Sequence, residues 1–198
     1  MKRLKNNKIN RELLLEQGIE LISEFGYHGT GLKKILDKVK IPKGSFYNYF
    51  DSKEHYVSEI IIHYSKDLIN RIDTYIDSTN DDPVTTMKNV YYTAIKEIEI
   101  KGQKGCLLGN LAAEIGLSSE QCAISMNEAF NKWKIRFVKL IEKAQKEDLI
   151  RDDLTAETLT DIFWDTWEGS LLRTKIDNNT SDLKKTVDVI LDTLFVVK

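Results

Sequence analysis

The residues between positions 30 and 53 combine small, basic and hydroxyl-bearing side chains in a pattern typical of a DNA-binding surface. Lysines neutralise phosphates, whereas hydroxyl and amide groups bind phosphates or base edges. Gly44 and Ser45 would let the backbone approach a duplex closely, because neither has a bulky side chain. We therefore predict a contact surface for double-stranded DNA made of the following residues: Thr30, Lys33, Lys43, Gly44, Ser45, Tyr47, Asn48, Tyr49 and Lys53.

Two short helices joined by a tight turn would hold these side chains in place. Apolar residues recur at helical spacing in residues 32–39, and Thr30 is placed to cap that helix. Pro42 cannot continue the helix but suits the start of the next one, over residues 43–50. Phe46 and Phe50 lie four apart and would face the core. With a bracing first helix that ends at Gly26, this segment predicts a helix-turn-helix.

The charge distribution points to the same end of the chain. Residues 1–53 contain eleven lysines and arginines against six acidic residues, a net charge of +5, whereas the remainder has a net charge of −7. A basic first quarter on an acidic body indicates a polyanionic partner at one end only. Taken alone, such a split also arises from solvated charges, so the helix-turn-helix spacing has to support it.

Helical periodicity continues through the rest of the chain, without a convincing two-residue alternation. We predict an all-α protein of about nine helices, with an N-terminal three-helix helix-turn-helix domain over residues 1–52. Residues 53–198 are expected to form a helical bundle for ligand sensing and dimerisation. The fourth helix is expected to begin near residue 53. The five later helices are expected to cover approximately these ranges: 83–101, 106–115, 126–144, 155–176 and 181–196.

The sequence gives little support for catalysis or metal binding. The three histidines are scattered, and neither Cys106 nor Cys122 has a second ligand at metal-binding spacing, so both are expected to be thiols. No nucleophile–base pair or phosphate loop is evident, and we predict neither an enzyme nor a bound metal or cofactor. The chain shows no signal peptide and no apolar run of membrane-spanning length, which predicts a cytoplasmic protein.

The helix-turn-helix region resembles the tetracycline-repressor (TetR) family. The resemblance rests on residues 25–29, 30–39, 41–50 and 52–54, about the first quarter of the chain. It implies a homodimeric transcriptional regulator that reads a near-palindromic operator. Two positions depart from the family pattern. Lys40 stands where the family often has glycine, and a left-handed turn there would be mildly strained in lysine. Asn48 stands where many relatives have histidine, which bears on the operator sequence.

Residues 105–114 and 164–175 resemble a subgroup that includes the repressor of N-ethylmaleimide reductase, which responds to electrophiles and reactive chlorine species. The resemblance implies that Cys106 is a sensor and that Lys175 is its partner. A cysteine in the first turn of a helix has a lowered pKa, and Lys104 or Lys175 would lower it further. The alternative is that Cys106 is a small buried apolar residue. Cys122 lacks such a context and is interpreted as core.

The second half also contains candidates for an effector pocket and a dimer interface. Trp133, Trp164 and Trp167 could line an apolar pocket, although their helical spacing is equally typical of a core. Within the last two helices, one apolar stripe suits a four-helix interface across a twofold axis, or packing within the chain's own bundle. The stripe consists of Leu183, Val187, Ile190, Leu191 and Leu194.

Together these features predict a repressor that a small apolar or electrophilic effector releases from its operator. A DNA-bound scaffold or interaction protein without a small effector is the alternative. The residue pattern does not identify the effector or the operator sequence, and it does not distinguish repression from activation.

Overall fold

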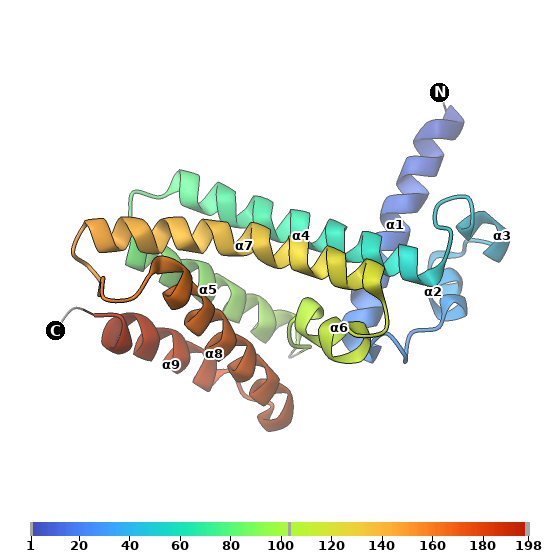
Figure 1. Cartoon of the computed structure of the whole chain (residues 1–198). Helices are drawn as coiled ribbons and strands as arrows, with labels where there is room; N and C mark the ends of the chain where they lie inside the picture. The colour runs from blue at the N-terminus through green and yellow to red at the C-terminus, as the bar shows by residue number, and fades with distance from the viewer. Residues whose placement is uncertain (1, 103, 197–198) are drawn as a thin grey trace. The chain divides into compact units, whose positions relative to one another are not determined.

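The computed structural model describes residues 2–102 and 104–196, with side chains from Asn10 on. Within these ranges the chain is helical and has no strand, which confirms the predicted all-α class (Figure 1). In the described part of the chain, nine α-helices are followed by a π-helical turn, Ile190–Leu194. The helices are α1 (Lys2–Phe25), α2 (Leu32–Val39), α3 (Lys43–Phe46), α4 (Lys53–Ser78), α5 (Pro83–Lys101), α6 (Leu107–Ile115), α7 (Glu120–Lys146), α8 (Ala156–Asp177) and α9 (Ser181–Val189).

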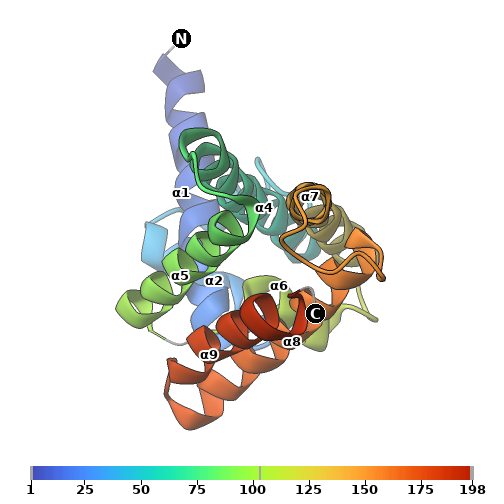
Figure 2. The ribbon, with the colours of Figure 1, turned by 90° about the vertical axis from the view of Figure 1, so that its left-hand side faces the viewer.

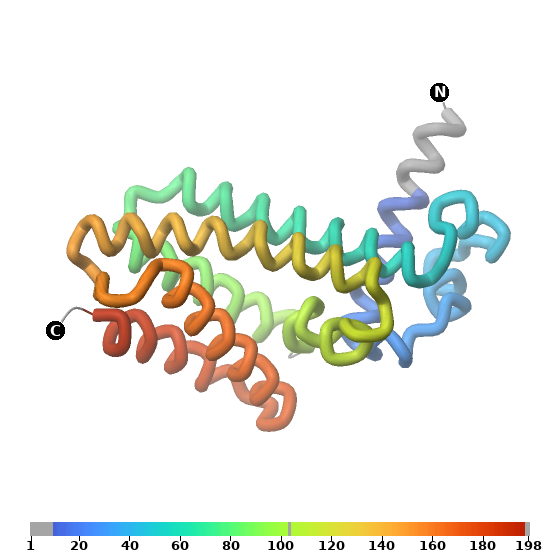
Figure 3. The backbone as a smooth tube through the Cα atoms, viewed as in Figure 1, coloured from blue at the N-terminus to red at the C-terminus, as the bar shows by residue number. Residues whose placement is uncertain are grey.

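The chain divides into two compact units, which can be followed along the backbone in Figure 3. The first unit comprises the residues up to Asp67 together with Cys106–Ala129. The second comprises Leu68–Gly105 together with the residues from Phe130 on. Helices α4 and α7 contribute to both units, and α6 belongs to the first. This division differs from the expected boundary between residues 52 and 53, so the functional boundary stays a prediction.

The core of the first unit is built around an aromatic cluster. Phe46, Phe50 and Tyr56 are all buried, and the ring centroids of Phe50 and Tyr56 are 4.8 Å apart. The Tyr56 hydroxyl donates a hydrogen bond to the Leu14 carbonyl at 2.5 Å. A Cβ at Gly18 would lie 2.2 Å from the Tyr56 hydroxyl oxygen, so α1 and α4 pack closely only because residue 18 is glycine. The predicted burial of Phe46 and Phe50 is therefore confirmed.

Local sequence signals set several helix ends, and the end of α1 at Gly26 is the one that the sequence analysis predicts. Gly26 has a φ of 72° directly after α1, where a residue with a Cβ would be strained. Ser52 accepts a hydrogen bond from the His55 N–H at 2.9 Å and so caps α4. Asp82 caps α5 by accepting from the N–H groups of Val84 and Thr85.

The core of the second unit is also aromatic, and in this unit α9 packs beside α8 and α5 (Figures 1 and 2). Tyr91 contacts Phe163 and Trp167 at centroid distances of 4.6 and 4.7 Å. Trp133 stacks on Phe137 at 4.6 Å. These rings bury a large apolar area on the inner faces of α5, α7 and α8.

The apolar stripe of the last helix faces inward, which corrects the predicted dimer interface. Leu183, Val187, Ile190 and Leu191 are at most 2% exposed within a single chain, because they pack on the chain's own bundle. Leu194 alone among the five predicted residues is exposed, at 52%. The alternative left open by the sequence is therefore the correct one for four of the five residues.

None of the helices in the described part of the chain combines the length and apolar character needed to cross a bilayer.

Candidate nucleic-acid interface and sensor segment

The turn between α2 and α3 adopts the left-handed conformation that the sequence predicts. Lys40 has a φ of 56° and ends α2, and its N–H donates to the Leu36 carbonyl. The Ile41 N–H donates to the same carbonyl at 3.1 Å. Both bonds end on a single acceptor, the Leu36 carbonyl, in the last turn of the helix. Because Lys40 has a Cβ, this conformation costs about 1 kcal/mol or more.

Helix α3 is shorter than the expected range of 43–50. It begins after Pro42, which occupies the N-cap, and it ends at Phe46. The Asn48 N–H then bonds to the Ser45 carbonyl at 3.2 Å, and the Tyr49 N–H to the Phe46 carbonyl at 2.9 Å. These contacts between residues three apart tighten the chain into successive turns. Six of the nine residues predicted to contact DNA, those from Lys43 to Tyr49, thus lie on a one-turn helix and the turns that follow it.

Most of the predicted DNA contacts lie at the surface of the first unit. Lys33, Lys43, Gly44 and Asn48 are exposed, and Tyr47 is 52% exposed. A Cβ at Gly44 would meet nothing within 4 Å, so the backbone there is open to a partner. The two remaining residues of the α3 segment, Ser45 and Tyr49, are half-buried.

Thr30 requires a correction both as a helix cap and as a DNA contact. Its side chain is fully buried, and its hydroxyl donates to the Leu21 carbonyl at 3.1 Å. The N-cap of α2 is Gly31, which makes no side-chain capping bond. The chain turns inward after α1, so Thr30 fixes the end of α1 and has no surface to offer a phosphate.

Lys53 is half-buried, and its ammonium is held within the first unit. Its Nζ donates to the Tyr27 carbonyl at 2.7 Å and lies 3.9 Å from the centroid of the Tyr27 ring. Burial lowers the pKa of Lys53, and the charge of Glu114 opposes that change. The predicted contact of Lys53 with a DNA phosphate would compete with these two interactions.

Glu114 of α6 connects to the same turn. Its carboxylate accepts hydrogen bonds from the backbone N–H groups of Tyr27 and His28 at 3.1 and 3.0 Å. A Cβ at Gly26 would lie 2.4 Å from Glu114 Oε1, so glycine admits the carboxylate. The partners are 86 and 87 residues apart along the chain, and a lone glutamate on a short helix predicts no such contact.

Hydrogen bonds also join the first turns of α4 and α7. The Ser119 hydroxyl bonds to the Glu54 carboxylate, and Ser58 and Ser125 share a hydrogen bond at 2.8 Å. Cys122 is fully buried beside them, and its Sγ donates to the Glu54 carbonyl at 3.6 Å. Burial raises the pKa of the Cys122 thiol. The interpretation of Cys122 as a core residue is confirmed.

Cys106 occupies the N-cap of α6, directly before its first helical residue. Its Sγ accepts from the Gly109 N–H at 3.5 Å, and its side chain is half-buried. The partial positive charge of a helix N-terminus favours a thiolate over a thiol. Lys175 lies exposed in the last turn of α8, in the second unit. The pairing of Lys175 with Cys106 stays a prediction.

The three predicted effector-pocket tryptophans lie in the aromatic core of the second unit. Trp133 and Trp167 are each 5% exposed, and Trp164 lies 4.4 Å from Trp133 between ring centroids. The Tyr91 hydroxyl is buried among these rings. Burial raises the pKa of Tyr91 far above its usual range, and the charge of Glu168 raises it further. A side-chain hydrogen bond with Trp133 lowers this pKa. This core is therefore apolar with a polar group at its centre.

Comparisons with known proteins agree with this arrangement. Residues 14–60 match the family model described as bacterial regulatory proteins, tetR family, and residues 84–190 match the tetracyclin repressor-like C-terminal domain. The HTH-type transcriptional repressor DhaR of Mycobacterium sp. (strain GP1) is 33% identical over 184 residues, 93% of this chain and 91% of the relative. The repressor NemR of Escherichia coli K12 is 29% identical over 88% of each chain. The crystal structure of regulatory protein TetR from Rhodobacter sphaeroides has a TM-score of 0.85 and 27% identity, over 93% of this chain and 98% of that one.

Proposed function

Because this chain belongs to the TetR family of DNA-binding transcriptional regulators, we propose that it is a repressor released from a near-palindromic operator by a small effector. Regulators of this family bind DNA operators and act as dimers. The observation that carries the proposal is the exposure of Lys33, Lys43, Gly44, Tyr47 and Asn48 around the turn that follows α2. The proposed place of action is the cytoplasm, where the operator lies.

Each exposed residue has a role that follows from its chemistry. Lys33 and Lys43 neutralise phosphates, which gives affinity without sequence preference. Tyr47 and Asn48 bond to base edges or phosphates, and the open backbone at Gly44 admits close approach. Ser45 and Tyr49 support this surface from half-buried positions, and Lys53 positions Tyr27. Two such surfaces in a dimer would read the two half-sites.

The proposed dimer surface is the outer face of α8, in place of the stripe on α9. Ile162, Leu172 and Ile176 are 41, 62 and 77% exposed, and with Gly169 they recur at three-, four- and seven-residue spacing. A Cβ at Gly169 would meet nothing within 4 Å, so the helix surface is open there to a second helix. Exposed apolar side chains aligned on one helix face favour burial against a partner. The exposed Leu194 is kept as part of this proposed surface.

The proposed release starts at Cys106. An electrophile such as a maleimide adds to the thiolate: the sulfur–carbon bond forms, and the double bond takes up a proton. The adduct at the N-cap would displace the beginning of α6, while Glu114, near the other end of the same nine-residue helix, holds the backbone of Tyr27 and His28. Movement of α6 would then loosen the turn that fixes α2, which lowers operator affinity.

The test uses purified protein and DNA from the region upstream of its own gene, with operator affinity measured before and after N-ethylmaleimide treatment. The proposal predicts release in the wild type and in Cys122→Ser, but not in Cys106→Ser. Release that persists in Cys106→Ser contradicts the thiol mechanism. The proposed trigger would then be a non-covalent effector bound among Trp133, Trp164 and Trp167. Lys175 would have no role in sensing.

A second candidate is a DNA-bound scaffold without a small effector. The close packing of Trp133 and Trp167, each 5% exposed, favours it, since a filled core leaves little room for a ligand. This candidate predicts operator binding that no electrophile or small apolar compound changes.

A further inference from the structure

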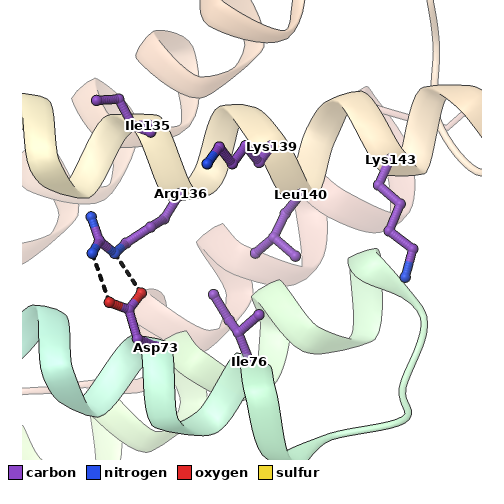
Figure 4. A pocket seen from close by; sticks show the side chains of 7 residues that line it. All are labelled: Asp73, Ile76, Ile135, Arg136, Lys139, Leu140 and Lys143. Carbon is purple, nitrogen blue, oxygen red and sulfur yellow. Dashed lines mark hydrogen bonds and ion pairs between the residues drawn. The ribbon is translucent and has the colours of Figure 1, made fainter.

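A groove of about 350 Å³ opens between the later turns of α4 and α7, within the second unit (Figure 4). Two residues of α4 and five of α7 line it, and none of them belongs to the proposed DNA or sensor sites. Its volume lies near the lower end of the range for small-molecule pockets.

The charges of the groove are unequal. Asp73 accepts two hydrogen bonds from the guanidinium of Arg136, at 2.5 Å from Nε and 2.6 Å from Nη2 (Figure 4). The pair balances its own charge, and a further bond from Arg136 Nη1 to the Lys132 carbonyl at 2.6 Å fixes the guanidinium. Lys139 and Lys143 therefore give the groove a net positive charge. Lys143 also forms an ion pair within α7, with 3.9 Å between its Nζ and Oε1 of Glu147.

The wall between these cations is apolar. Ile76 of α4 and Leu140 of α7 point toward one another across the groove (Figure 4). Ile135, on the same helix, is 53% exposed. An inorganic anion would gain nothing from these side chains, and a neutral hydrocarbon would gain nothing from the lysines. A molecule that has both a hydrocarbon body and an anionic end would use both.

We propose that this groove binds a small amphipathic carboxylate. Its hydrocarbon body covers Ile76 and Leu140, and its carboxylate pairs with the ammonium group of Lys139 or of Lys143, which lie on either side of that apolar pair (Figure 4). The site is additional to the proposed thiol sensor and does not depend on it.

Isothermal titration of the full-length protein with octanoate tests this proposal, with acetate and 1-octanol as probes that have only one of the two features. We expect one saturable octanoate site per chain, and weaker binding of acetate and octanol by about tenfold or more. The double variant Lys139→Gln/Lys143→Gln should lose about tenfold in octanoate affinity, since it removes both ammonium groups with which the carboxylate can pair.

The matched control is Lys132→Gln/Lys146→Gln, which removes two exposed lysines of the same helix that do not line the groove. It should bind octanoate as the wild type does, and so should Cys106→Ser. Equal affinity for octanol and octanoate, an equal loss in the control variant, or no saturable binding would each overturn the proposal. Octanoate binding that follows the oligomeric state of the protein, and not the presence of the two lysines, would also overturn the proposal. The groove would then be an interface between protein chains.

Discussion

The carboxylate of Glu114 accepts a hydrogen bond from the backbone N–H of Tyr27 at 3.1 Å, and so fastens α6 to the end of α1. The adjacent His28 N–H makes the same bond at 3.0 Å, and Lys53 bonds to the Tyr27 carbonyl from the other side. The turn that leads into α2 is therefore held by charged side chains of α4 and α6. This arrangement connects α6, the helix of the proposed sensor Cys106, to the proposed DNA-binding surface.

Replacing Glu114 with glutamine should weaken that connection. An amide has one accepting oxygen and no negative charge, so it cannot serve both N–H groups equally well. We expect the free energy of unfolding to fall by about 1–2 kcal/mol and operator affinity to fall by about threefold to tenfold. Chemical denaturation and fluorescence anisotropy with labelled DNA measure the two effects. The control is Glu128→Gln, an exposed glutamate of α7. A variant with wild-type stability and affinity would refute the role of Glu114.

Substitutions on α8 should separate dimer contacts from core contacts. Leu172→Asp with Ile176→Asp places charges on the exposed face, so we expect folded monomers in light scattering. Val187→Asp instead buries a charge in the chain's own bundle, where Val187 has no exposed surface, and should prevent stable folding. A dimer that survives the double aspartate substitution would contradict the proposed interface.

The Asp73–Arg136 pair should make a pH-dependent contribution to stability. Hydrogen bonds from Arg136 lower the pKa of Asp73 below its usual value. The stabilisation is thus present above the pKa of the unfolded chain, about 3.9, and is lost as pH falls through the lower folded value. Because the Asp73 side chain is 40% exposed, solvent screening limits the effect to about 0.5–1 kcal/mol. We expect Asp73→Asn to melt about 1–4 °C below the wild type at pH 7, and the gap to narrow as pH approaches 3. A gap that stays constant over that range would argue against this assignment.

Lys40→Gly should stabilise the protein, because glycine adopts the left-handed conformation without strain. The expected gain is about 1 kcal/mol, or about 2–4 °C in Tm. The comparison is Lys38→Gly, which places glycine inside α2 and should cost about 1 kcal/mol. Equal destabilisation by both substitutions would show that Lys40 is not strained.

The sequence predicted features that depend on neighbours along the chain. The burial of Phe46 and Phe50, the turn at Lys40 and the end of α1 at Gly26 follow from spacing and local backbone preference. Thr30 was misassigned because a threonine two residues before a helix suits a cap equally well in an inward turn. The stripe that includes Leu183 and Val187 was misassigned because apolar periodicity shows that a face is buried, but not whether a partner or the same chain buries it. Glu114 was missed because its partners lie in another helix–turn region far along the chain.

The most direct test of DNA binding is the slope of log K against log salt concentration, measured by anisotropy on DNA from the chain's own upstream region. We predict that Lys33→Gln/Lys43→Gln lowers the magnitude of this slope by about 2, since each lysine neutralises about one phosphate. Lys132→Gln/Lys146→Gln, with the same change in net charge on α7, should keep the wild-type slope. An unchanged slope in the folded Lys33→Gln/Lys43→Gln variant, or an equal loss in the α7 control, would contradict the assignment of this surface to DNA.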